Sequence, residues 1–157
     1  MKRYTIIMAI VAALLIPCLM FAAGTVTQSY APVYSSEGNT NMATLSFAWT
    51  TDSSESATAT TNTTISDQIA GKYVTAAITD PDAADAPAAS YDIVVTDANG
   101  VDIMGGKLAD RSATATEQAR PYIGSDCAPR PVAGALTLTV TSAGSGKSGI
   151  TILYLSR

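Results

Sequence analysis

Three aspartates lie close together at Asp80, Asp82 and Asp85, and their carboxylates are the kind of oxygen ligand that Ca²⁺ prefers. An EF-hand loop beginning at Asp80 would need glycine at its sixth position and glutamate at its twelfth, where this chain has Asp85 and Tyr91. The sequence therefore predicts a solvated acidic turn, with a calcium site of another kind as the alternative. These three aspartates are the candidate metal ligands.

The segment Gly146-Lys147-Ser148 resembles the end of a phosphate-binding loop. That motif needs a glycine five positions before its second glycine, and Thr141 stands there instead. It also needs a helix to follow, whose N-terminal N–H groups bind the phosphates, whereas an alternating apolar pattern follows here. The segment is predicted to be a loop between strands.

Catalytic chemistry has little support in the residue types. The chain has no histidine, which excludes histidine bases, Ser-His-Asp triads and histidine-bearing metal sites. Its thirteen acidic residues always offer some carboxylate pair, but no spacing singles out two that would share a cleft. We therefore predict no catalytic residue and no cofactor, so the protein is not expected to be an enzyme. A small hydrolase that uses two carboxylates is the alternative.

The N-terminus has the pattern of an export signal. Lys2 and Arg3 precede an uncharged stretch from Ile6 to Ala23, which ends in small residues. We predict a signal peptide over residues 1–23 and a single domain over 24–157, located in the secreted, periplasmic or cell-surface space. An uncleaved membrane anchor is the alternative, although Pro17 interrupts the apolar stretch.

Removal of residues 1–23 changes both the charge and the cysteine count. Seven of the nine basic residues remain against thirteen acids, which gives a net charge of −6. An acidic surface repels phosphate backbones, so nucleic acid is not an expected partner. Cys127 is then the one cysteine, either a free buried thiol or a pairing site for a second copy.

The mature part has a hydrophobic period of two. Apolar residues alternate with others in four windows, and Val26–Tyr34 and Lys72–Thr79 show the same pattern more weakly. The four windows are Leu45–Trp49, Tyr91–Val95, Leu136–Val140 and Ile150–Tyr154. Since successive strand side chains point to opposite faces, the pattern predicts about seven strands, each with one buried face.

Turn signals separate these windows. Asn-Gly within Asp97–Val101 predicts a type I′ hairpin, and Gly144–Gly149 predicts a hairpin loop between the last two strands. Asp80–Pro87 reads as a long turn, and Ser53–Thr64 as a loop or a loosely paired edge. Only Ala109–Ala119 is predicted to form a helical turn.

Short strands separated by turns predict an all-β fold, a single antiparallel β-sandwich of Ig-like or jelly-roll-like type with Greek-key connections. Charged residues are only 14% of the 157 residues, which excludes a long coiled coil or a disordered acidic tail. The residues expected in the core are Leu45, Phe47, Trp49, Ile78, Ile93, Val95, Leu136, Leu138, Val140, Ile150 and Ile152.

From about residue 40 to 157 the chain resembles small β-rich proteins encoded among tailed-phage and prophage structural genes. The segments that support this resemblance are Tyr91–Asp97, Asn99–Asp102, Gly105-Gly106, Leu45–Thr50, Thr79–Pro81, Leu108–Arg111 and Ala133–Thr139. The resemblance implies a non-enzymatic, virion-associated role such as decoration or attachment, and it supplies no catalytic residues. The signal-like N-terminus departs from that family's pattern.

The functional expectation is a non-catalytic structural or interaction protein. Its partners would be other protein surfaces or further copies of itself, and a membrane only through an uncleaved N-terminal segment. Contacts are expected from the loops 53–64, 80–90 and 109–130, or from edge strands with unpaired N–H and C=O groups. A secreted or surface adhesin, or a carbohydrate-binding module, is the main alternative among binding proteins.

Overall fold

The protein is described by a computed structural model that covers residues 24–34 and 41–157. The signal or anchor predicted for residues 1–23 lies outside this part of the chain. The described residues are mostly β, in antiparallel sheets, with one short helix. Among these described residues, no helix has the length and apolar character needed to cross a membrane.

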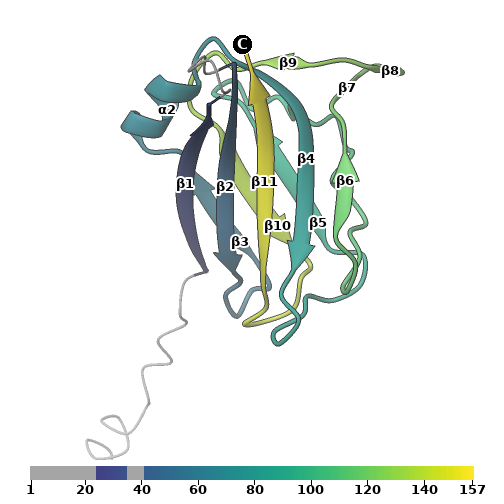
Figure 1. The fold of residues 1–157 in the computed structure, drawn as a ribbon. Coiled ribbons are helices and arrows are strands. Elements are labelled where there is room, and N and C mark those ends of the chain that lie inside the picture. The colour runs from purple at the N-terminus through teal and green to yellow at the C-terminus, as the bar shows by residue number, and fades with distance from the viewer. Residues whose placement is uncertain (1–23, 35–40) are drawn as a thin grey trace, which may run out of the picture.

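The larger sheet has six strands, all paired antiparallel. Four of them have nine residues each and lie side by side, with a short strand at one edge and another pairing with the start of β4 (Figure 1). The strands are, in order across the sheet, β1 (Thr25–Val33), β2 (Met42–Thr50), β11 (Ser148–Ser156), β4 (Tyr73–Pro81), β6 (Glu117–Ala119) and, beside β4, β9 (Arg130–Pro131).

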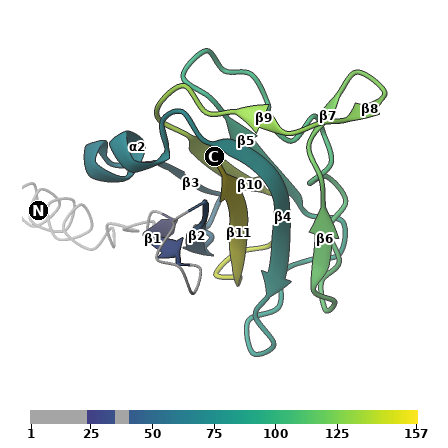
Figure 2. The ribbon, with the colours of Figure 1, turned by 45° about the horizontal axis from the view of Figure 1, so that its top comes forward.

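A smaller, three-stranded sheet lies behind the larger one (Figure 1), in the order β3 (Ala57–Thr60), β10 (Thr137–Thr141) and β5 (Asp92–Thr96). A third pairing joins β7 (Tyr122–Ile123) to β8 (Asp126–Cys127), and this hairpin extends from the β6 side of the molecule (Figure 2). The described residues thus form eleven strands, seven of them with four or more residues. The sequence indicated about seven and did not reveal the four short ones.

The chain passes repeatedly from one sheet to the other. β11 lies between β2 and β4, so the last strand completes the centre of the larger sheet. β10 belongs to the smaller sheet, so the loop Gly144–Gly149 joins two sheets and is not the hairpin that we predicted. Thr51 fixes this loop, because its N–H donates to the Lys147 carbonyl at 2.8 Å and its Oγ1 accepts the Lys147 N–H at 2.9 Å.

A side chain also joins the two sheets at the β1 edge. Gln28 Nε2 donates to the Thr60 carbonyl on β3 at 2.7 Å, and Gln28 Oε1 accepts the N–H of Asn62 at 3.2 Å. These bonds satisfy backbone groups at the edge of β3 that would otherwise lack partners. They also place the β1 and β3 edges in direct contact.

The apolar core lies between the sheets, and most of its predicted members are confirmed. Eight of the eleven predicted residues are buried: Leu45, Phe47, Trp49, Ile93, Val95, Leu136, Leu138 and Val140. The prediction was wrong for β11, where Thr151, Leu153 and Leu155 point inward and Ile150 and Ile152 point outward. Ile78, which pairs with Ile152, also lies on the outer side and is only partly buried.

The reason for the error in β11 is that this strand is apolar on both faces, so alternation alone cannot choose between them. The choice is made by Gly149, which pairs with Trp49 on β2. A Cβ on Gly149 would lie 2.5 Å from Trp49 Cζ2, so only glycine leaves room for the indole. With Gly149 facing inward, Thr151, Leu153 and Leu155 follow it.

The helix is also not where the sequence placed it. Ala109–Ala119 contains turns and β6, whereas the helix α2 spans Thr63–Ile69 and begins at the end of Ser53–Thr64, the segment that we expected to be a loop or edge. Asn62 caps α2, because its Oδ1 accepts the Ile65 N–H at 3.0 Å. Ile65 and Ile69 are buried and four residues apart, a signal too short to stand out in the sequence.

The Asn99-Gly100 turn occupies its predicted place with another geometry. Gly100 has a φ of 78°, but Asn99 is not among the residues with positive φ, so the turn is not of type I′. Asp97 Oδ1 accepts the N–H groups of Asn99 and Val101, both at 2.9 Å, and fixes the turn itself. The backbone N–H groups of Val101 and Asn99 lower the pKa of Asp97 below its usual value.

Tyr91 is a buried titratable group at one end of the core, where its ring centroid lies 5.6 Å from that of Trp49. Burial raises the pKa of Tyr91 to about 12 from 10.0, while the charge of Arg111 opposes the shift. The phenol therefore loses its proton near pH 10 in the unfolded chain and near pH 12 in the folded protein. The stability from this group is complete below pH 10 and is lost as the pH rises toward 12.

We expect Tyr91→Phe to remove this part of the alkaline sensitivity, because phenylalanine has no proton to release. Urea unfolding of both proteins at pH 9, 10 and 11 would show the wild type losing more stability than the variant. Parallel losses in the two proteins would contradict the assignment. The control is Tyr34→Phe, which removes the hydroxyl of a residue that is 67% exposed and makes no contribution to the core.

Candidate functional site

The outer face of the larger sheet is built around β11. Ile152, the middle residue of this strand, pairs with Ile78 on β4 and with Ser46 on β2. Next to it, Tyr154 pairs with Ala76, and Ile150 at the other side is 40% exposed. Ile150, Ile152 and Tyr154 on β11 and Ile78 on β4 thus form an apolar column on the outer side of the sheet. Ile150 is exposed, and the other three side chains are partly buried.

Around this column the outer face has few charges, and one of them is Arg120, which lines a hollow with Ala76 on the β6 side. On β1, β2, β11 and β4, which the structure describes in full, Asp80 is the one charged side chain that points outward. The other outward positions are Thr25, Thr27, Ser29, Ala31, Val33, Met42, Thr44, Ser46, Ala48, Thr50, Ser148, Ile150, Ile152, Tyr154, Ser156, Tyr73, Ala76 and Ile78. We call this surface the outer face of the larger sheet.

The outer face of the smaller sheet has a different composition. Its outward positions are mostly threonines, which stay solvated, with Val94 as the aliphatic exception at 37% exposure. The hydroxyls of Thr60 and Thr137 lie 2.8 Å apart across β3 and β10 and form a hydrogen bond. This face matches the predicted pattern of one buried and one wet side, whereas in the larger sheet β11 departs from that pattern.

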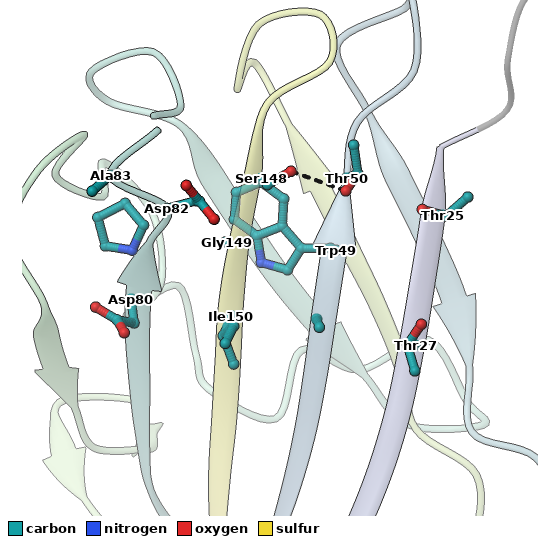
Figure 3. A pocket seen from close by; sticks show the side chains of 12 residues that line it. Thr25, Thr27, Trp49, Thr50, Asp80, Asp82, Ala83, Ser148, Gly149 and Ile150 are labelled. Atoms are coloured by element: carbon teal, nitrogen blue, oxygen red, sulfur yellow. Dashed lines mark hydrogen bonds between the residues drawn. The ribbon is translucent and has the colours of Figure 1, made fainter. Parts of the chain in front are cut away.

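One end of the outer face is hollowed. The hollow has a volume of about 680 Å³ and is lined by residues from the start of β1, the end of β2, the start of β11 and the end of β4 (Figure 3). The hydroxyls of Thr50 and Ser148 form a hydrogen bond of 2.9 Å across its floor, and Ile150 is apolar beside them. Hydroxyls, an aliphatic side chain and carboxylates therefore meet in one concave surface.

Two of the three predicted metal ligands, Asp80 and Asp82, lie in this hollow, and Asp85 is not among its lining residues. Asp80 accepts a hydrogen bond from the Thr116 hydroxyl. Asp82 Oδ1 accepts the N–H groups of Ala84 at 2.7 Å and Asp85 at 3.1 Å, so it fixes the turn that follows β4.

The backbone N–H groups of Asp85 and Ala84 lower the pKa of Asp82 below its usual value, which keeps this carboxylate ionised in the hollow. Within residues 24–34 and 41–157, no three His, Cys, Asp or Glu side chains are grouped in a way that could hold a metal ion. Calcium binding at Asp80, Asp82 and Asp85 stays the untested alternative to the solvated acidic turn that the sequence predicts.

Cys127 lies in β8, on the hairpin that extends from the molecule, and its side chain is exposed. It lines a second, smaller hollow of about 340 Å³ together with Gln118 and Arg120. The prediction of a buried free thiol is therefore wrong, because the side chain is exposed on the hairpin. Pairing with a second copy stays a prediction.

The three loops that were expected to make contacts differ in secondary structure and in their position relative to the large hollow. Ser53–Thr64 contains β3 and the start of α2, and Asp80–Ser90 forms one rim of the large hollow. The segment 109–130 contains three short strands and an ion pair of 3.8 Å between Arg111 and Glu117. The outer face of the larger sheet was missed, because the sequence placed Ile150 and Ile152 in the core.

Comparison with protein-family models and with curated proteins found no match to this chain. The function of the chain is therefore inferred from its geometry and from the sequence segments that carry the resemblance.

Proposed function

We propose that this chain is a non-catalytic structural or interaction protein, exported and acting through its surface, in the manner of a virion-associated decoration or attachment protein. Its two sheets would form an Ig-like or jelly-roll-like β-sandwich that serves as a rigid scaffold. The observation that supports this proposal is the contrast between the two outer faces. The smaller sheet bears mostly threonines together with Val94 and Asp92, and the larger sheet bears the apolar column.

The physical reason is the cost of leaving such a column in water. Monomeric soluble proteins rarely expose contiguous apolar patches of more than a few hundred Å², and larger ones mark interaction sites. A strand that is apolar on both faces is typical of sheets covered on both sides. In β11 the inward residues Thr151, Leu153 and Leu155 contact the core. No second layer of the described residues packs on the outward residues Ile150, Ile152 and Tyr154.

A carbohydrate-binding or adhesin function is the second candidate, and the large hollow favours it. Asp80 and Asp82 together with the Thr50 and Ser148 hydroxyls could accept and donate hydrogen bonds to a sugar. However, Trp49, the indole nearest this hollow, is only 2% exposed, so its ring offers no open platform for stacking.

Fractionation of cells that express the full chain would test the proposal. We expect the protein outside the cytoplasm, sedimenting with surface or particle fractions. Ile152→Lys should leave those fractions while Val94→Lys, a matched change on the other sheet, should remain in them. Retention of the wild type in the cytoplasm, or equal behaviour of both variants, would contradict the proposal. A glycan array on which only Asp80→Asn and Asp82→Asn lose binding would favour the second candidate.

A further inference from the structure

We infer that the outer face of the larger sheet is the contact surface between two copies of this chain, packed sheet against sheet. This inference deepens the proposed function, on which it rests, by naming the partner as a second copy. It starts from the four nine-residue strands β1, β2, β11 and β4.

The size of this face suits a dimer. With strands about 4.8 Å apart and a rise of about 3.3 Å per residue, four strands of this length cover roughly 570 Å². Specific pairs bury about 600 Å² per partner at the lower end of their range, before the side chains at the rim are counted. A second sheet of the same dimensions would cover the face from edge to edge.

Charge also favours a second copy over a foreign partner. The whole chain has a net charge of −4, so two copies repel each other over most orientations. Along β1, β2 and β11 the outer face has no charged side chain, and on β4 only Asp80 interrupts it. Most of this face therefore allows two acidic copies to approach closely, and its carboxylates, Asp80 and Asp82, are confined to the hollowed end.

The positions of the apolar residues fit a twofold arrangement. In a symmetric dimer one surface contacts itself, so the residue nearest the axis meets its own copy. Ile152 is the middle residue of β11, and its cross-strand partners are Ile78 and Ser46. An axis near Ile152 would place Ile78 and Tyr154 of each copy within the apolar centre, and Asp80 toward the rim. Sheets packed face to face lie about 10 Å apart, with strands crossing at about 30°.

Sedimentation equilibrium of the purified protein, expressed as the full chain and isolated with its own N-terminal processing, would test this inference. We expect a mass twice that of one chain at concentrations on the order of 10–100 μM. Ile152→Lys should return it to a single chain, because two ammonium groups would face each other at the axis. Val94→Lys is the matched control and should remain dimeric. Circular dichroism would verify that both variants are folded.

Disulfide trapping locates the contact independently. In a background with Cys18→Ser and Cys127→Ser, oxidation of Ile152→Cys should give a covalent dimer, and Val94→Cys should give none. A wild type that stays monomeric at the highest concentration would overturn the inference, as would a dimer that Ile152→Lys leaves intact. If the monomer nevertheless reaches particle or surface fractions in an Ile152-dependent way, the proposed function survives and only its partner is wrong.

Discussion

Gly149→Ala is expected to destabilise the folded protein by about 3 kcal/mol, near the upper end of what overpacking costs. The added Cβ would lie 2.5 Å from Trp49 Cζ2 and 3.1 Å from the Asp80 carbonyl oxygen. Trp49 is buried and cannot swing away, and the carbonyl belongs to a strand that pairs with β11. For a chain of this length the loss corresponds to a melting temperature lower by about 10 °C, measurable by calorimetry.

Gly134→Ala is the matched control, since no atom lies within 4 Å of its added Cβ. Its φ is not positive, so alanine fits there without strain and should leave stability unchanged or slightly higher. A double-mutant cycle then identifies the cause. In a Trp49→Leu background, Gly149→Ala should cost clearly less than it does alone. Equal costs in the two backgrounds would show that the clash with the indole is not the reason.

Thr151→Val is expected to cost about 1–3 kcal/mol even though valine has nearly the same shape. The Oγ1 of Thr151 accepts the Trp49 Nε1–H at 3.3 Å inside the core. Valine would leave this indole N–H buried without a partner. Chemical denaturation of the variant at neutral pH would measure the loss.

The comparison residue is Thr79, which pairs directly with Thr151 across β4 and β11 and is equally buried. Its Oγ1 has no hydrogen-bond partner among the described residues. Thr79→Val therefore removes an unsatisfied group, and stability should change by less than about 0.5 kcal/mol or increase. If both threonines prove equally costly to replace, the Trp49–Thr151 bond is not the cause.

The sequence predicted the strands more reliably than their faces. Leu45, Phe47 and Trp49 alternate with small or polar residues, so one face is clearly apolar and the prediction for β2 was correct. In β11 both sets of positions are apolar, and the deciding contact is Gly149 against Trp49, a pair separated by about a hundred positions in the chain. No local pattern contains that information.

The outer face of the larger sheet could not be predicted as a site, because the sequence does not show which apolar face of β11 points outward. A sequence search for function looks for carboxylates, nucleophiles and ligand spacings, and it found Asp80 and Asp82, which do lie together at one hollow. The apolar column of Ile78, Ile150 and Ile152 was assigned to the interior, where such residues usually belong. Only the pairing of β11 with β4 shows that these three side chains share the outside of a sheet.

The register of the larger sheet also determines how the protein bears tension. Thr25 on β1 lies at the end of the sheet where Ser148 begins β11, and Ser156 lies at the opposite end, beside Met42. A pull between Thr25 and Ser156 therefore runs parallel to the strands and loads the nine-residue ladders on both sides of β2 in shear. Since ladder hydrogen bonds lie across the strands, many must break together, and the fold resists such a force far better than peeling from one edge.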